Sequence, residues 1–164
     1  MPDPQADTAR RADQSPTRPL RLGAYLPYRL AIASNQVSSM VARAYQQRFG
    51  VTIWEWRVIA ILGEGRPVTA QALCESTAMD KVSVSRAARA LTDRGLIRRL
   101  SNVADRRSHL LELTDAGRQV YDEIAPVALA AESELLSGMS AEEIDLLSSV
   151  LDRLRDRARA MGSR

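Results

Sequence analysis

The stretch from Asp80 to Leu113 constrains the fold more than any other part of the chain. Asp80 can cap a helix that runs to Arg94, and Gly95 follows as the residue type that commonly ends a helix. Two short apolar-containing runs then flank a polar turn at residues 102–107, which is the pattern of a β-hairpin with a longer loop. The stretch therefore predicts a helix that leads directly into a hairpin.

The predicted helix has two different faces when its residues are placed at 100° intervals. Its apolar face should pack inside the protein and holds Val84, Ala87, Ala88 and Leu91. The opposite face holds Val82, Ser83, Arg86, Arg89, Ala90 and Asp93, with Ser85 at the border. Arginine can bond guanine edges and serine can reach bases or phosphates, so this face suits a DNA major groove. A merely solvent-exposed amphipathic helix is the commoner structure behind such a pattern.

The turn of the hairpin adds a second signal, because Asp105 precedes two arginines there. A carboxylate near an arginine can hold the guanidinium in a fixed direction, and arginines on a loop suit a narrow minor groove. A helix joined to an arginine-tipped hairpin makes a winged helix-turn-helix. The expected DNA-binding residues are Lys81, Ser83, Ser85, Arg86, Arg89, Asp105, Arg106 and Arg107.

The charges are unevenly distributed along the chain, although the formal net charge is only +3. Residues 80–107 contain eight Lys or Arg against three Asp, whereas residues 119–152 contain eight acids and no Lys or Arg. A concentrated basic segment is typical of a phosphate-binding surface. A solvated charged face is the alternative interpretation.

The rest of the chain predicts mostly helices. Helical periodicity covers residues 27–49, 53–63 and 70–76, with a short strand at Val68 and Thr69. Thr114 can cap a long helix, and Ser140 with Glu143 forms a capping box for the last one. The expected fold is therefore mainly α with a small β-hairpin wing.

The last helix carries a regular apolar seam that steps by three and four residues: Ile144, Leu147, Leu151, Leu154, Ala158 and Met161. Such spacing is typical of a coiled coil, in which a partner helix covers the seam. We expect Ile144, Leu147, Leu151 and Leu154 to contribute to dimerisation.

Other classes of protein find little support. The single histidine and single cysteine cannot supply a clustered metal site, and the eight glycines form no phosphate-binding loop. We expect no enzyme activity, no cofactor and no metal. No apolar run reaches the roughly 18 residues of a membrane span, and the N-terminus lacks the apolar stretch of a secretory signal. A cytoplasmic protein is expected.

The segments MDKVSVSRAARALTDRGLIRR and DRRSHLLELTDAG, followed by the closing helix, resemble the MarR (multiple-antibiotic-resistance regulator) family. The resemblance covers roughly residues 22–160. It implies a homodimer built from the N- and C-terminal helices, a recognition helix after Asp80, and Asp105 with Arg107 as paired charges of the wing. It also implies a repressor that binds operator DNA and is released by a small, often aromatic, ligand.

The expected domains are a mobile arm at 1–21, a dimerisation helix at 22–50, the winged lobe at 51–113 and C-terminal dimerisation helices at 114–164. Six of the seven aromatic residues lie between residues 25 and 56. Asn35, Ser38 and Trp54 are the candidate effector-binding residues. The alternative is that these aromatic residues serve the core and the dimer junction.

Cys74 is interpreted as a structural residue, because a free cysteine commonly acts as a small buried apolar side chain. Two other functions remain open at this point. One is a redox-responsive repressor that works through Cys74, and the other is a protein-interaction module that uses the basic lobe to bind an acidic partner.

Overall fold

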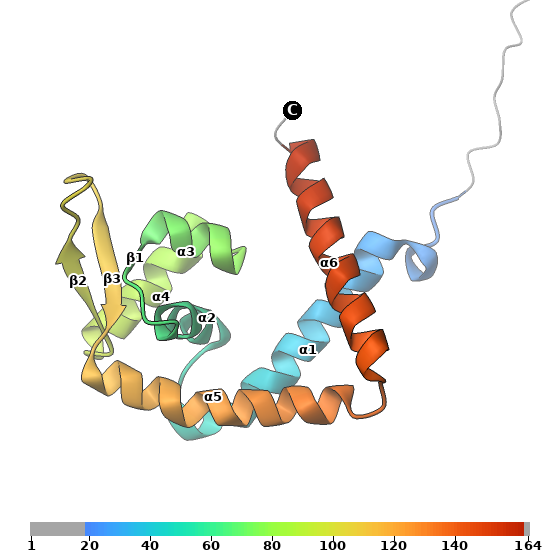
Figure 1. Ribbon diagram of the computed structural model, residues 1–164, viewed down its shortest axis with the longest axis horizontal. Coiled ribbons are helices and arrows are strands. Elements are labelled where there is room, and N and C mark those ends of the chain that lie inside the picture. Colours follow the sequence, from blue (N-terminus) through green and yellow to red (C-terminus); the bar gives the residue numbers. More distant parts are fainter. Residues whose placement is uncertain (1–18, 163–164) are drawn as a thin grey trace, which may run out of the picture. The chain divides into compact units, whose positions relative to one another are not determined.

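A computed structural model describes residues 19–162 of the protein (Figure 1). Most of the expected mobile arm at 1–21 therefore lies outside the described residues, and residues 19–21 are exposed. The chain divides into two units between Gln36 and Val37, and each unit is described by itself. None of the helices among residues 19–162 is long and apolar enough to cross a membrane.

The described part of the first unit, residues 19–36, contains a 3-10 helix, η1 (Leu22–Ala24), and the first half of α1 (Leu26–Phe49). Large apolar side chains on this unit are exposed, among them Leu22, Leu26, Leu30 and Ile32. No residue of η1 is buried. The described residues of this unit thus leave an apolar surface uncovered.

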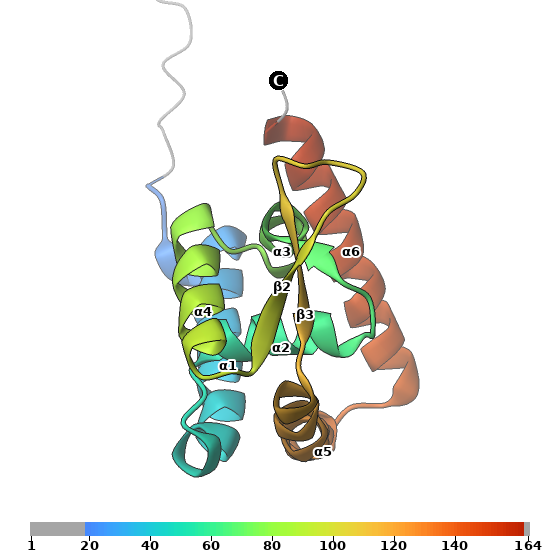
Figure 2. The same ribbon diagram turned by 90° about the vertical axis from the view of Figure 1, so that its left-hand side faces the viewer.

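The second unit begins with the remainder of α1 and contains all the other elements. These are α2 (Ile53–Gly63), β1 (Val68–Thr69), α3 (Ala70–Thr77), α4 (Lys81–Asp93), β2 (Ile97–Ser101), β3 (His109–Leu113), α5 (Asp115–Leu136) and α6 (Ala141–Gly162). The strands form an antiparallel sheet in the order β1-β3-β2 (Figures 1 and 2). The mainly helical fold with a hairpin wing is confirmed, and β1 adds a third strand to the hairpin.

Local capping explains where the helices begin. Thr52 accepts a hydrogen bond from the Glu55 amide (3.2 Å), and the Glu55 carboxylate accepts one from the Thr52 amide (2.7 Å). Ser140 and Glu143 make the same reciprocal box at the start of α6. Each cap satisfies helix amides that would otherwise lack a partner. The predicted capping box at Ser140 is therefore present.

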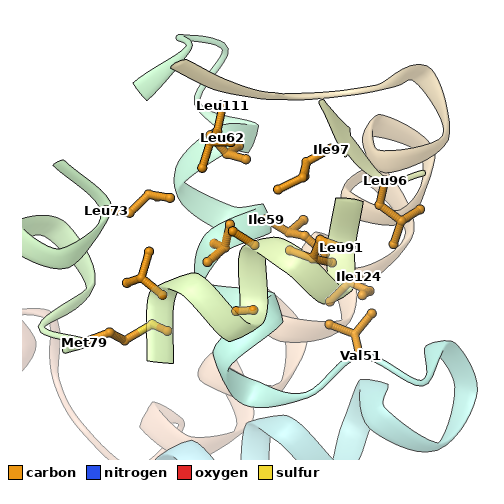
Figure 3. Close-up of a cluster of buried hydrophobic side chains, with 14 of the residues drawn as sticks. Val51, Ile59, Leu62, Leu73, Met79, Leu91, Leu96, Ile97, Leu111 and Ile124 are labelled. Carbon is orange, nitrogen blue, oxygen red and sulfur yellow. The ribbon is translucent and has the colours of Figure 1, made fainter. Parts of the chain in front are cut away.

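The core of the second unit surrounds α2, which contacts α3, α4, α5 and β3. Figure 3 shows apolar side chains from these elements converging. The largest fully buried ones are Tyr45, Val51, Val58, Ile59, Leu73, Val84, Leu91, Ile97 and Ile124. Full burial of each Val, Leu or Ile side chain stabilises the fold by about 1.5–3 kcal/mol, so this core is sufficient to hold α4 and the sheet in place.

The first turn of α5 lies very close to the start of the wing. The backbone amide of Thr114 donates to the Leu96 carbonyl (3.0 Å), and Gly117 is buried directly above that carbonyl. A Cβ atom at Gly117 would collide with the Leu96 carbonyl oxygen, which belongs to the backbone and cannot rotate away. Glycine is therefore required here for close packing.

We predict that Gly117→Ala lowers the free energy of unfolding by about 1–3 kcal/mol, because α5 must shift to relieve the collision. Gly138→Ala is the matched control, since no atom lies within 4 Å of a Cβ at that position. Urea denaturation of both variants measures the difference. Equal stability of the two variants would contradict the close packing of α5 against the wing.

Candidate nucleic-acid interface

The inner face of α4 is held firmly in the core. Its buried residues are those predicted from the sequence: Val84, Ala87, Ala88 and Leu91. The helix ends in a Schellman motif, in which the Gly95 amide donates to Thr92 and the Leu96 amide donates to Leu91. Gly95 has φ +68°, a left-handed conformation that favours glycine. The orientation of the outer face is thereby fixed.

Asp80 caps the beginning of α4. Its carboxylate accepts hydrogen bonds from the Ser83 amide (2.8 Å) and the Ser83 hydroxyl (2.9 Å). The bond from the Ser83 amide is the main reason that the pKa of Asp80 lies below its ordinary value, with the hydroxyl bond next. The hydroxyl proton of Ser83 is thus engaged within the protein, and Ser83 is half-buried.

The outer face of α4 forms a shallow groove of about 350 Å³. It is lined by Lys81, Val82, Ser85, Arg86 and Arg89. All five of these residues are exposed. The three cationic side chains and one hydroxyl in this groove match the donors that phosphates and guanine edges accept.

The loop of the wing is organised by hydrogen bonds to its own backbone. The Asn102 side-chain oxygen accepts from the amides of Ala104 (3.1 Å) and Asp105 (3.3 Å). The Asn102 amide nitrogen donates to the Ser108 hydroxyl (2.8 Å), which itself donates to the Asp105 carbonyl (3.1 Å). Asparagine and aspartate shape turns in this way.

The sequence predicts that the Asp105 carboxylate holds the guanidinium of Arg107, but the structure shows a different contact. The carboxylate accepts a hydrogen bond from the backbone amide of Arg107 (3.0 Å). Within residues 19–162, no guanidinium lies within 4.0 Å of this carboxylate. Asp105 therefore fixes the backbone from which Arg107 projects, and the arginine side chain stays available.

A cleft of about 570 Å³ lies between α4 and the wing. Figure 2 shows the positions of α4 and of the strands β2 and β3. The lining of the cleft includes Lys81 and Ser85 of α4, Arg99 of β2, and Asp105 and Arg107 of the loop. The cleft thus brings together predicted residues from both parts of the candidate interface.

Cys74 of α3 also lines this cleft and is half-buried. It is therefore less buried than we expected for a purely structural cysteine. Among residues 19–162, no group of three or more His, Cys, Asp or Glu is placed to hold a metal ion.

The basic segment divides into two groups of cations. Arg98 pairs with Glu112 across the hairpin (2.6 Å), and Arg94 lies 3.7 Å from the carboxylate of Glu55. The other six cations have no carboxylate within 4.0 Å in the described part of the chain: Lys81, Arg86, Arg89, Arg99, Arg106 and Arg107. All six are exposed and lie on α4 or the wing. The positive charge available to a ligand is therefore concentrated there.

Two residues of this surface were not among the sequence candidates. Arg99 lies opposite Leu111 in the sheet, so its position in the cleft depends on the register of the hairpin. The register is set by the Asn102 to Ser108 loop, whose turn residues were visible in the sequence. Val82 lines the groove on the outer face of α4, but it carries no polar group that would mark it in the sequence as a DNA contact.

The predicted dimerisation seam on α6 faces outward. Leu147, Leu151 and Leu154 have exposed fractions of 42%, 46% and 37%, and Ile144 is half-buried. No residue of α6 is buried. The described part of the second unit therefore does not cover this seam.

The candidate effector residues lie in different environments. Asn35 belongs to the first unit and is exposed, and Ser38 of the second unit is half-buried. Trp54 is 47% exposed, and the Arg57 guanidinium lies 5.2 Å from its ring centroid.

Trp56 packs between two tyrosines in the second unit, with ring centroids 5.6 Å from Tyr45 and 6.0 Å from Tyr121. The Tyr45 hydroxyl is buried without a hydrogen-bond partner among the described residues. Burial raises the pKa of Tyr45 to about 12, against an opposing effect of Arg57. Trp56 and Tyr45 therefore belong to the core.

The capped helix, its outward cations and the adjoining hairpin define a winged helix-turn-helix protein. A sequence model of the MarR family matches residues 49–108. The chain is similar over 86% of its length to a MarR/EmrR family transcriptional regulator from Acinetobacter sp. ADP1, with 25% identity, a TM-score of 0.79 and 99% of that chain covered. The chain thus carries a MarR-family sequence match at residues 49–108 and has the fold of MarR/EmrR family transcriptional regulators.

Two further solved structures share this fold. A probable transcriptional regulator from Pseudomonas aeruginosa is 29% identical, with a TM-score of 0.69, and the match covers 82% of this chain and 99% of that one. BpsR from Bordetella bronchiseptica is 21% identical, with a TM-score of 0.75 and coverage of 85% and 99%. DNA binding by BpsR is regulated by 6-hydroxynicotinic acid.

The wing geometry predicts different effects for two substitutions of Asp105. Asp105→Ala removes the acceptor for the Arg107 amide, so DNA affinity should fall roughly three- to tenfold, the effect of about one hydrogen bond. Asp105→Asn keeps an acceptor oxygen and should retain most of the affinity. Fluorescence anisotropy with labelled DNA at fixed salt compares the variants. Tighter binding by both would show instead that repulsion between Asp105 and phosphates dominates.

Proposed function

We propose that this protein is a cytoplasmic homodimeric repressor, which binds double-stranded operator DNA and releases it when a small aromatic ligand binds. The observation that carries the proposal is the gathering on α4 and the wing of six cations that have no carboxylate partner among residues 19–162. A surface of this kind attracts a polyanion, and a capped helix can enter the major groove.

In the proposed complex, α4 lies in the major groove and the wing lies against the neighbouring backbone. Arg86 bonds a guanine edge, and Ser85 donates to a base or a phosphate. The phosphate contacts come from Lys81, Arg89, Arg106 and Arg107. Ser83 contributes through the cap of α4, since its hydroxyl donates a hydrogen bond to the Asp80 carboxylate.

The proposed dimer covers the apolar surfaces that the described chain leaves exposed. The seam on α6 repeats over several turns, which is longer than an ordinary core contact requires. The exposed leucines of the first unit offer a further apolar surface for a second copy. Two-fold pairing would place two α4 helices in successive major grooves, roughly 34–36 Å apart.

The ligand class is proposed from exposed aromatic and cationic groups. Trp54 is 47% exposed and has the Arg57 guanidinium over its ring, an arrangement that suits an aromatic ligand bearing an acidic group. Ser38 is proposed as a polar contact for the ligand. The regulation of BpsR by an aromatic hydroxy acid supports a ligand of this class.

The proposed contact of Arg86 with a guanine is tested with the variant Arg86→Ala. The DNA is a duplex that the purified wild-type protein enriches from randomised sequences, and the binding affinity is measured for both proteins. Affinity should fall by about 1–3 kcal/mol, because a bidentate contact to guanine is lost. Asp93→Ala is the control, since Asp93 lies at the far end of the exposed face of α4 and should matter less. Unchanged affinity of Arg86→Ala at matched salt would remove Arg86 from the interface.

The dimer is tested with the double variant Leu147→Asp and Leu151→Asp. Charges on the seam should separate the protomers and abolish binding to a full palindromic site, because the two α4 helices lose their fixed spacing. Sedimentation and circular dichroism report the mass and the folding, and Leu129→Asp is a control at an exposed leucine on α5. A folded monomer with wild-type affinity for the full site would overturn the dimer-spacing mechanism.

A further inference from the structure

One apolar side chain on α4 is not used by the core. Val82 is 60% exposed, whereas Val84 and Leu91 on the same helix are 1% and 0% exposed. Val82 is the only large apolar side chain of α4 that is exposed. The packing of the protein therefore gives no reason for an apolar residue at this position.

The surroundings of Val82 are cationic. It lines the groove on the outer face of α4 together with Lys81, Ser85, Arg86 and Arg89. It is the second residue of the helix and lies one turn before Arg86, on the same face. The N-terminal residues of a recognition helix are those that contact base edges. Val82 is thus placed among the groups that would face DNA.

The chemistry of the major groove offers few partners for a valine. Phosphates and sugars present oxygen atoms, and the edges of guanine, cytosine and adenine present hydrogen-bonding groups. The C5-methyl group of thymine is the apolar group that a base presents in this groove. A valine surrounded by cations can therefore discriminate bases in only one way, by contacting that methyl group.

We propose that Val82 is a specificity-determining residue that reads a thymine methyl group in each half of the operator. This inference rests on the proposed binding of DNA through α4. Val82 and Arg86 are four residues apart, about 6 Å along the helix axis. Base pairs are stacked about 3.4 Å apart. The thymine therefore lies within about two base pairs of the guanine that Arg86 contacts.

The test replaces thymine by uracil, which removes only the C5-methyl group. A duplex is first enriched from randomised DNA by the full-length protein, and each thymine near the Arg86-dependent guanine is then replaced in turn. Replacing the contacted thymine in one half-site should weaken binding by the wild-type protein about fourfold, the effect of withdrawing one methyl group from an apolar contact. Binding is measured by anisotropy at fixed salt.

Protein variants identify the side chain that senses the methyl group. Val82→Ala should bind the thymine and uracil duplexes equally, whereas Val82→Thr keeps a γ-methyl group and should retain a preference for thymine. Val103→Ala is the matched control, because Val103 is also exposed (93%) but lies on the wing, and it should keep the full preference. This comparison is a double-mutant cycle between protein and DNA. Thermal melting should show little change, since Val82 is outside the core.

Two outcomes would overturn this inference while leaving the proposed function intact. One is wild-type binding that is indifferent to uracil at every position, and the other is a uracil penalty that persists undiminished in Val82→Ala. A protein that enriches no DNA sequence contradicts the proposed function itself, and this inference with it. A uracil penalty that disappears only with Val82→Ala supports the assignment.

Discussion

Arg94 joins three segments on which the DNA-binding surface depends. It stands at the C-terminal cap of α4, and its guanidinium donates to the carbonyls of Phe49 (3.2 Å) and Gly50 (3.1 Å) at the end of α1. It also lies 3.7 Å from the carboxylate of Glu55, which is only 9% exposed. A buried carboxylate without partners destabilises a fold strongly. The Thr52 amide and Arg94 satisfy Glu55 together, so α4, α1 and α2 are held in one arrangement.

Two other arginines also donate to backbone carbonyls at the ends of helices. Besides Arg94, Arg118 donates to the Gly63 carbonyl at the end of α2 (2.9 Å), and Arg57 donates to Thr77 at the end of α3 (3.5 Å). Cations suit these positions because helix C-termini carry unsatisfied carbonyls and partial negative charge. These arginines connect elements of the second unit, whereas the cations of the α4 groove and the wing remain outward. The eight acidic residues within 119–152 belong to α5 and α6, so they lie on other elements than the cations of α4 and the wing.

The sequence was sufficient for features that depend on neighbouring residues. Helix caps at Asp80 and Ser140, and the glycine that ends α4, act over three to five residues, so their residue types predict their structure. The two faces of α4 follow from periodicity in the same way. The partners of individual polar groups were not predictable, because they depend on register and tertiary packing. From the sequence, the Asp105 carboxylate could accept a hydrogen bond from a guanidinium or from a backbone amide. The loop geometry set by Asn102 brings it to the Arg107 amide.

The connection through Arg94 also limits how a ligand could release DNA. A ligand shifts a protein between two states only by binding one of them more tightly, and a shift from 1:99 to 99:1 requires about 10⁴-fold tighter binding. Displacement of the end of α1 relative to α2 must either break the bonds from Arg94 to Phe49 and Gly50 or move α4 as well. Breaking them also removes the cation beside the buried Glu55 carboxylate, which is unfavourable. Movement of α4 with α1 relative to α2 would likewise draw Arg94 away from Glu55 of α2. The least costly response therefore keeps α1, α2 and α4 together, and in the proposed dimer their joint movement changes the spacing of the two recognition helices on DNA.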